Sequence, residues 1–218
     1  NAKLIIKLIN DVAKVINNDP AVRGLLKIVF LPNYNVSLAE VIVPAADLSE
    51  QISTAGMEAS GTGNMKFMAN GAITIGTMDG ANVEMHREVG SDNIVIFGLT
   101  TQEVNDKRAK GEVPRTAIDA SPRLKEALDT IASGVFSPDD PHRYRDLIGG
   151  IYDHDWFMVA RDFDAYAEAQ AGVNAIWRDK KRWNAMAIRN TAHVGFFSSD
   201  RTIRQYAEDI WDVPVAQV

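Results

Sequence analysis

Cysteine is absent from all 218 residues of the chain. The protein therefore has no disulfide bonds, no thiolate ligands for a metal ion and no cysteine nucleophile. A chain without cysteine is compatible with a reducing compartment, and a cytoplasmic location is expected. The fold must be held together by packing, and hydrophobic residues, 46% of the chain, are numerous enough to fill a core.

Two further absences narrow the class of protein. No stretch reaches the roughly 18 consecutive apolar residues that a membrane-spanning helix needs, and residues 1–17 carry lysines in an amphipathic pattern, unlike a signal peptide. Neither sign of charge dominates, because 23 basic and 29 acidic residues are mixed along the chain and give a net charge of −6. Such a distribution indicates neither nucleic acid nor a membrane as a partner.

The chain begins with a helical pattern. Apolar residues recur every three or four positions over residues 5–16, as on one face of an α-helix. The β-branched run Leu25–Phe30, bounded by glycine and proline, predicts a short buried strand. A second helix is predicted to be capped by Ser37, with Glu40 three residues later completing a capping box, and to end or bend at Pro44.

Strands and helices then alternate up to about residue 100. Residues 72–75 and 94–97 are predicted to be strands, and residues 79–88 a short helix between them. This alternation indicates an α/β fold in which helices wrap a parallel sheet. The later part is predicted to be mainly helical, with helices at residues 124–131, 143–151, 163–177 and 203–211 and loops at residues 111–122 and 133–141.

The first chemical signal is the run from Glu58 to Lys66, with the sequence EASGTGNMK. Its glycines allow backbone N–H groups to approach an anion closely, and the start of the following helix adds its positive dipole end. The run matches neither nucleotide-phosphate motif, because Thr62 stands where a Walker A loop requires lysine and Lys66 where a dinucleotide loop requires glycine. From these residues alone, a phosphate site and a simple tight turn are about equally favoured.

Lys66 is the second signal. It is expected on the first turn of an apolar helix, where partial burial and the helix dipole favour the neutral amine that reacts with aldehydes. A surface lysine beside hydrophobic neighbours gives the same pattern and is the commoner case. The histidines at positions 86, 142, 154 and 193 show no spacing typical of metal ligands, so no metal site is predicted.

The stretch Glu58–Asn70 resembles the pyridoxal-phosphate signature of the α-glucan phosphorylases, Glu-Ala-Ser-Gly-x-Gly-x-Met-Lys-x-x-x-Asn. Further blocks resemble the same family over essentially the whole chain. They are YNVSLAE from residue 34, IVPAADLSEQISTAG from 42, TMDGANVE from 77, FSP from 136, IRN from 188 and SSDRTI from 198. The chain is thus identified as a C-terminal part of a glycogen, starch or maltodextrin phosphorylase.

This resemblance implies a fold and a domain organisation. Residues 1–100 would form the second half of the Rossmann-like C-terminal lobe in a two-lobed, B-type glycosyltransferase fold, and would carry the cofactor site. Residues 101–218 would form a mainly helical extension of that lobe. The N-terminal lobe and the family's basic phosphate-binding motif would lie upstream, so the chain alone is predicted to be inactive. The full-length protein is expected to be an allosteric homodimer.

The resemblance also implies a reaction. Inorganic phosphate would attack the terminal α-1,4-linked glucose of an α-glucan and release glucose 1-phosphate, with the 5′-phosphate of pyridoxal 5′-phosphate exchanging the proton. By the same resemblance, Lys66 tethers the cofactor through its aldehyde carbon. Thr62 and Gly63 bind the cofactor phosphate through backbone N–H groups, and Tyr34 and Val36 line the cofactor pocket.

The loop before Lys66 is assigned to the sugar. By resemblance, the 3- and 4-hydroxyls of the reacting glucose are bound by Glu58, Ala59, Ser60 and Gly61. A carboxylate suits a sugar diol because it accepts two charge-assisted O–H bonds. A rival hypothesis is a shortened chain that binds pyridoxal phosphate or glucan without catalysis, which the gene sequence upstream of Asn1 would distinguish.

Overall fold

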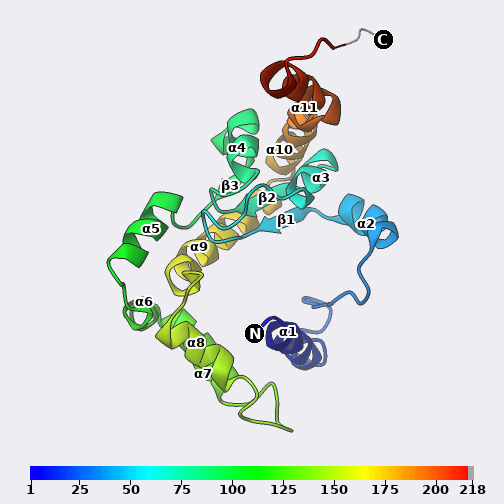
Figure 1. Ribbon diagram of the computed structural model, residues 1–218. Coiled ribbons are helices and arrows are strands. Elements are labelled where there is room, and N and C mark those ends of the chain that lie inside the picture. The colour runs from blue at the N-terminus through cyan, green and yellow to red at the C-terminus, as the bar shows by residue number, and fades with distance from the viewer. Residues whose placement is uncertain (216–218) are drawn as a thin grey trace. The chain divides into compact units, whose positions relative to one another are not determined.

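The computed structural model describes residues 1–215 (Figure 1). Packing divides the chain into two compact units. The first consists of residues 1–38 and 105–165, and the second of residues 39–104 and those from Tyr166 on. The predicted division at residue 100 concerns the domains of the longer protein and stays a prediction.

The first unit is helical. It contains α1 (Ala2–Ile16), α6 (Pro114–Ala120), α7 (Pro122–Ala132), α8 (Arg145–Asp153) and the beginning of α9 (Val159–Arg178). Its core is built from one side of these helices, and includes Leu8, Ile118, Leu128, Tyr144 and Ile148. The helical patterns at residues 5–16, 124–131 and 143–151 are therefore confirmed.

Helix α6 lies where a loop was predicted. Pro114 occupies the beginning of this helix, where proline costs little because the first N–H groups have no partner within the helix. Ile118 faces the core and is fully buried. The prediction was wrong because glycine and proline usually interrupt a helix, whereas Pro114 starts a short one here.

The predicted strand Leu25–Phe30 does not form in the structure. Leu25 is 86% exposed, and residues 26–30 have no regular secondary structure. The side chain of Asn17 accepts from the N–H of Ile28 at 2.9 Å and donates to its carbonyl oxygen at 2.7 Å. Composition gave this segment strand propensity, but a strand also needs a neighbouring strand, and a side chain takes that place here.

Helix α2 (Val36–Ile42) begins one residue before Ser37. The side chain of Asn35 accepts from the N–H of Leu38 at 3.1 Å, so Asn35 caps this helix and the prediction of Ser37 as the cap was wrong. A 3₁₀ turn over Val43–Ala45 follows. It contains Pro44, and the predicted end of the helix near that residue is confirmed.

The second unit contains a parallel sheet, as the alternating pattern predicted. Strands β1 (Leu48–Gln51), β2 (Ile73–Gly76) and β3 (Val95–Ile96) lie in the order β1-β2-β3, with Leu48 beside Ile73 and Ile75 beside Val95. Helix α3 (Gly63–Ala69) connects the first two strands, and α4 (Asn82–Val89) connects the second and third. Strand β1 was not predicted from the sequence, because three of its four residues, LSEQ, are polar.

Helices cover both faces of this sheet (Figure 1). On one face, Ile73 and Ile75 pack against Val173 of α9 and against Trp183 and Met186 of α10 (Lys180–His193). The other face is covered by α3 and α4, whose main core residues are Met68, Met85 and Val89. A hydrophobic core on each side fixes the sheet, and with it the loops at the carboxyl ends of its strands.

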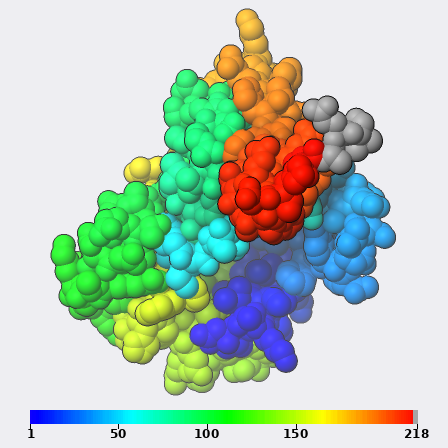
Figure 2. All heavy atoms as spheres, turned by 45° about the horizontal axis from the view of Figure 1, so that its top comes forward, coloured from blue at the N-terminus to red at the C-terminus, as the bar shows by residue number. Residues whose placement is uncertain are grey.

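The remaining elements are short. Helix α5 (Thr101–Ala109) follows β3, and α11 (Ser199–Tyr206) is followed by a π-helical turn at Ala207–Trp211. Figure 2 shows α11 in red at the surface of the second unit, beside α4 in green. The predicted helices at residues 163–177 and 203–211 are confirmed. Between residues 1 and 215, no helix has the length and apolarity to cross a membrane.

Candidate functional site

The signature residues lie on the loop that leads from the carboxyl end of β1 into α3 and along α3 itself. Ligands bind at this end of the strands in open parallel sheets. The loop turns at Met57, whose N–H donates to the carbonyl oxygen of Thr54 at 3.0 Å. Gly61 has φ +76°, a backbone conformation that favours glycine. The residues assigned to the sugar, Glu58, Ala59 and Ser60, are all exposed.

The turn after β2 holds this loop in place through hydrogen bonds. The buried carboxylate of Asp79 accepts from Ser53 Oγ at 2.7 Å and from the backbone N–H groups of Gly56 and Glu58 at 2.8 and 3.0 Å. The N–H of Ala81 donates to the carbonyl oxygen of Ser60 at 2.6 Å. The loop and the turn thus form one hydrogen-bonded structure.

Thr62 and Gly63 form the start of α3. Within residues 1–215, the backbone N–H groups of these two residues donate to no protein acceptor. A Cβ on Gly63 would have no atom within 4 Å, so the side of the backbone on which a side chain would stand is open. Two neighbouring donors beside open space at a helix start are suited to an anion.

Lys66 lies in the first turn of α3, as predicted, but its side chain is exposed in this chain. The partial burial expected for the Lys66 side chain is not found here. Helix α3 packs through Asn64 and Met68 and presents Lys66 on its outer side. The carbonyl oxygen of Lys66 accepts from the side-chain amide of Asn70 at 2.9 Å. Asn70, the last signature residue, thus closes the turn that carries Lys66.

Tyr34 and Val36 belong to the first unit, whereas Lys66 belongs to the second. Both side chains are on the surface, 65% and 77% exposed. The structure brings Glu58, Thr62, Gly63 and Lys66 into one loop and helix, while the place of Tyr34 and Val36 beside the cofactor stays a prediction.

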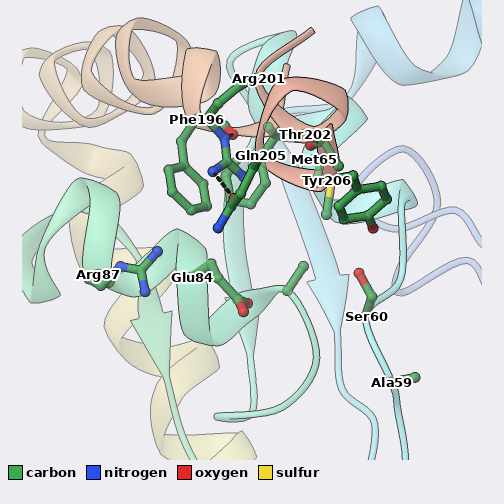
Figure 3. A pocket seen from close by; sticks show the side chains of 12 residues that line it. Ala59, Ser60, Met65, Glu84, Arg87, Phe196, Arg201, Thr202, Gln205 and Tyr206 are labelled. Carbon is green, nitrogen blue, oxygen red and sulfur yellow. Dashed lines mark hydrogen bonds between the residues drawn. The ribbon is translucent and has the colours of Figure 1, made fainter. Parts of the chain in front are cut away.

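A pocket of about 570 Å³ opens beside the loop that contains Ala59 and Ser60 (Figure 3). Ala59 and Ser60 form one wall, and α4 contributes Glu84 and Arg87. The opposite wall comes from the segment that includes Phe196 and α11, where Arg201 lies over the Phe196 ring at 3.9 Å from its centre. Lys66 is not one of the residues that line this pocket.

The comparison with known proteins covers nearly the whole chain. The model of the family described as "Carbohydrate phosphorylase" matches residues 1–213. The chain belongs to the carbohydrate phosphorylase family.

Phosphorylases from distant organisms match it to a similar degree. The chain is 55% identical to the brain form of glycogen phosphorylase from Pongo abelii over 212 residues, 97% of this chain and 25% of that protein. It is 54% identical to the liver form from Bos taurus over 217 residues, covering 100% and 26% of the two chains. It is 54% identical to glycogen phosphorylase from Synechocystis, at 97% and 25% coverage. The chain thus spans about a quarter of the length of these relatives.

One group of residues that supports the site was not predicted from the sequence. The block TMDGANVE indicated only a resemblance to the family, and no role was predicted for Asp79. A signal was present, because Asp79 and Gly80 follow the apolar strand β2 after only two residues, at the edge of the sheet where ligands bind. What the sequence did not reveal is that Asp79 turns away from solvent, towards loop residues that lie 21 to 26 positions earlier in the chain and lead into the helix of Lys66.

Proposed function

We propose that this chain is the C-terminal part of a glycogen phosphorylase, which releases glucose 1-phosphate from the ends of α-1,4-linked glucan by attack of inorganic phosphate. The observation that carries the proposal is the signature loop, in which Glu58, the N–H groups of Thr62 and Gly63, and Lys66 follow one another within a loop and a single helical turn. Each residue type matches the part that the reaction requires of it.

The residues fit pyridoxal 5′-phosphate as the cofactor. Two adjacent N–H groups without a protein acceptor are suited to its phosphate, and Gly63 leaves room for close approach. Lys66, on the same helix, offers an accessible amine for the aldehyde carbon. Lys66 serves as a tether that fixes the distance between the ring and the loop, and Tyr34 and Val36 line the ring's pocket.

When bound, the cofactor supplies a phosphate group that exchanges a proton with the substrate phosphate. The chain's own contribution is to hold that phosphate at the N–H groups of Thr62 and Gly63. Backbone donors are fixed by the fold and need no rearrangement as charge changes, which is the condition for electrostatic stabilisation of a reacting anion. Lys66 takes no part in proton transfer.

The loop before the helix binds the reacting glucose. The carboxylate of Glu58 is exposed and accepts from the 3-hydroxyl, while Ala59, Ser60 and Gly61 contribute backbone groups around the 3- and 4-hydroxyls. Hydrogen bonds to a charged acceptor contribute about 1.5–3 kcal/mol, so Glu58 is the residue of this loop on which sugar recognition depends most. The pocket lined by Ala59 and Ser60 lies directly beside it.

The rest of the enzyme lies outside this chain. We place residues 1–100 in the second half of the C-terminal lobe of a two-lobed, B-type glycosyltransferase fold and residues 101–218 in its helical extension. The other lobe, which supplies the basic motif for the phosphates, completes the cleft. The full-length enzyme is a cytoplasmic, allosteric homodimer, and the 218-residue chain alone does not catalyse phosphorolysis.

The test is borohydride reduction of the full-length protein followed by peptide mapping. The proposal requires a pyridoxyl group on Lys66 and its loss, with loss of activity, in Lys66→Arg. The matched control is Lys110→Arg, an exposed lysine on the loop after α5, which should keep both the label and the activity. A label on another lysine would show that Lys66 is not the cofactor lysine. A labelled but inactive full-length protein would favour the binding module without catalysis.

A further inference from the structure

The carboxylate of Glu58 makes no hydrogen bond or ion pair within residues 1–215, although the backbone beside it is firmly held. Whether a flexible side chain can reach one particular hydroxyl of a sugar depends on the position of its own backbone. The groups that fix this backbone are therefore as important for recognition as the carboxylate itself.

Asp79 is the centre of that support. It is only 5% exposed. Its Oδ1 accepts from the N–H of Gly56 at 2.8 Å, and its Oδ2 accepts from Ser53 Oγ at 2.7 Å and from the N–H of Glu58 at 3.0 Å. These donors lie 21 to 26 residues earlier in the chain. One buried carboxylate thus binds the loop on both sides of its turn and reaches the Glu58 backbone directly.

Gly80 brings the same turn against the other end of the loop. Its φ is +49°, and a Cβ at this position would lie 2.5 Å from the carbonyl oxygen of Ser60 and 3.0 Å from Cγ of Glu58. The N–H of the next residue, Ala81, donates to that Ser60 oxygen. The backbone of Glu58 is consequently fixed from the residues before and after it.

We propose that Asp79 is a positioning residue for sugar recognition, which holds the Glu58 backbone so that the Glu58 carboxylate meets the 3-hydroxyl of the reacting glucose. This inference rests on the proposed function, because it takes Glu58 as the sugar ligand. Asp79 itself touches neither sugar nor cofactor.

The substitution Asp79→Asn isolates this role, because it preserves size and changes only the hydrogen-bonding pattern. If the new amide oxygen accepts from Gly56, the amide nitrogen faces Ser53, whose hydroxyl can turn to accept, and also the N–H of Glu58, which cannot. If the amide is flipped, the N–H of Gly56 faces a donor instead. Either orientation breaks one of the two backbone bonds that shape the loop. Ser53→Ala is the matched control, because it removes one donor and keeps both backbone bonds.

The experiment measures glucan synthesis by the full-length holoenzyme, with glucose 1-phosphate and with 3-deoxyglucose 1-phosphate. We expect Asp79→Asn to lower kcat/KM for glucose 1-phosphate by about 10- to 100-fold and to leave kcat/KM for the 3-deoxy analogue nearly unchanged. The same pattern is expected of Glu58→Gln. The double variant should be little worse than Glu58→Gln alone, since both changes remove the same contact. Ser53→Ala should stay within about twofold of the wild type for both substrates.

The outcomes separate the two proposals. If Glu58→Gln affects both substrates equally, the assignment of Glu58 to the sugar is wrong, and with it the proposed function of the loop. If Glu58→Gln selectively lowers kcat/KM for glucose 1-phosphate but Asp79→Asn does not, only the positioning role is overturned. The same holds if Asp79→Asn lowers kcat/KM for both substrates in parallel. Should Asp79→Asn fail to fold, Gly80→Ala displaces Ser60 and Glu58 with Asp79 intact, and must show the same selective loss.

Discussion

The side-chain amide of Asn64 donates a hydrogen bond to Oδ1 of Asn82 across 3.1 Å, and the two residues are only 3% and 2% exposed. The Nδ2 of Asn82 donates in turn to the carbonyl oxygens of Gln51 and Thr77 at 3.1 and 3.0 Å. A single side chain thus joins the ends of β1 and β2 to the first turn of α3. The helix that carries Lys66 is held to the sheet by this connection.

Asn82→Asp should destabilise the protein by about 2–5 kcal/mol. The oxygen that replaces Nδ2 would face two carbonyl oxygens in a buried site, and each buried group left without a partner costs about 1–3 kcal/mol. Urea unfolding monitored by circular dichroism measures the change. Asn10→Asp is the control, because the Asn10 amide binds the Ile6 carbonyl on the exposed face of α1 and should change stability by less than about 1 kcal/mol. Equal losses in the two variants would contradict this account.

Two glycine-to-alanine substitutions should change the stability of the protein in opposite directions. A Cβ on Gly76, at the end of β2, would lie 2.5 Å from the backbone oxygen of Gln51 and 2.6 Å from Nδ2 of Asn82. Gly76→Ala should therefore separate β1 from β2 and lower the melting temperature markedly. Gly172 lies on an exposed face of α9 with no atom within 4 Å of its would-be Cβ, so Gly172→Ala should stabilise by up to about 1 kcal/mol. Thermal unfolding of the two variants decides, and a stable Gly76→Ala would refute the close approach.

In the first unit, stability should fall in acid through Asp11. Burial raises the pKa of Asp11, but hydrogen bonds from Lys7 and Tyr144, the charge of Lys7 and a hydrogen bond from Arg143 outweigh it and hold the pKa below its ordinary value of 3.8. A carboxyl whose pKa is lower in the folded state stabilises the protein at pH values above 3.8, its ordinary pKa. This contribution to stability is lost as the pH falls through the folded-state pKa.

Tyr144→Phe tests this cluster. The Tyr144 hydroxyl donates to Asp11 Oδ2 at 2.5 Å, and its removal should cost about 1.5–3 kcal/mol at pH 7, the range for a hydrogen bond to a charged group. The cost should shrink as the pH falls and Asp11 is protonated in both proteins. Urea unfolding at several pH values between neutral and acid measures it, and a difference that does not depend on pH would exclude the charged hydrogen bond.

The sequence predicted those parts of the fold that local patterns determine. Helices with a clear apolar face, such as α1 and α7, and the buried strand β2 lie close to where periodicity placed them. The failures depended on partners elsewhere in the chain. Leu25–Phe30 has strand composition but pairs with the Asn17 side chain. Strand β1 has three polar residues out of four but becomes a strand through its pairing with β2.

The same limit applies to the site. Glycine spacing and one lysine indicated an anion loop without distinguishing it from a plain turn, and the family signature then named the residues of the loop. Neither showed how the loop is held. Asp79 lies 21 residues after Glu58, and only the parallel pairing of β1 with β2 brings the two together.

Asn70, the last residue of the signature, should control how firmly Lys66 is held. Its side-chain amide donates to the carbonyl oxygen of Lys66, four residues earlier, at 2.9 Å. Asn18 makes the same contact with Lys14 at 2.7 Å, at the end of α1. Replacing either residue with alanine removes one exposed hydrogen bond and should cost about 0.5–1.5 kcal/mol.

The two alanine variants should differ in their hold on the cofactor. If Lys66 is the tether, loosening its turn should speed the release of pyridoxal phosphate from the full-length Asn70→Ala protein several-fold, because the amine and the N–H groups of Thr62 and Gly63 then lose their fixed separation. Asn18→Ala should release the cofactor at the wild-type rate. Fluorescence of the bound cofactor during dialysis measures both rates, and equal rates in the two variants would mean that Asn70 does no more than end a helix.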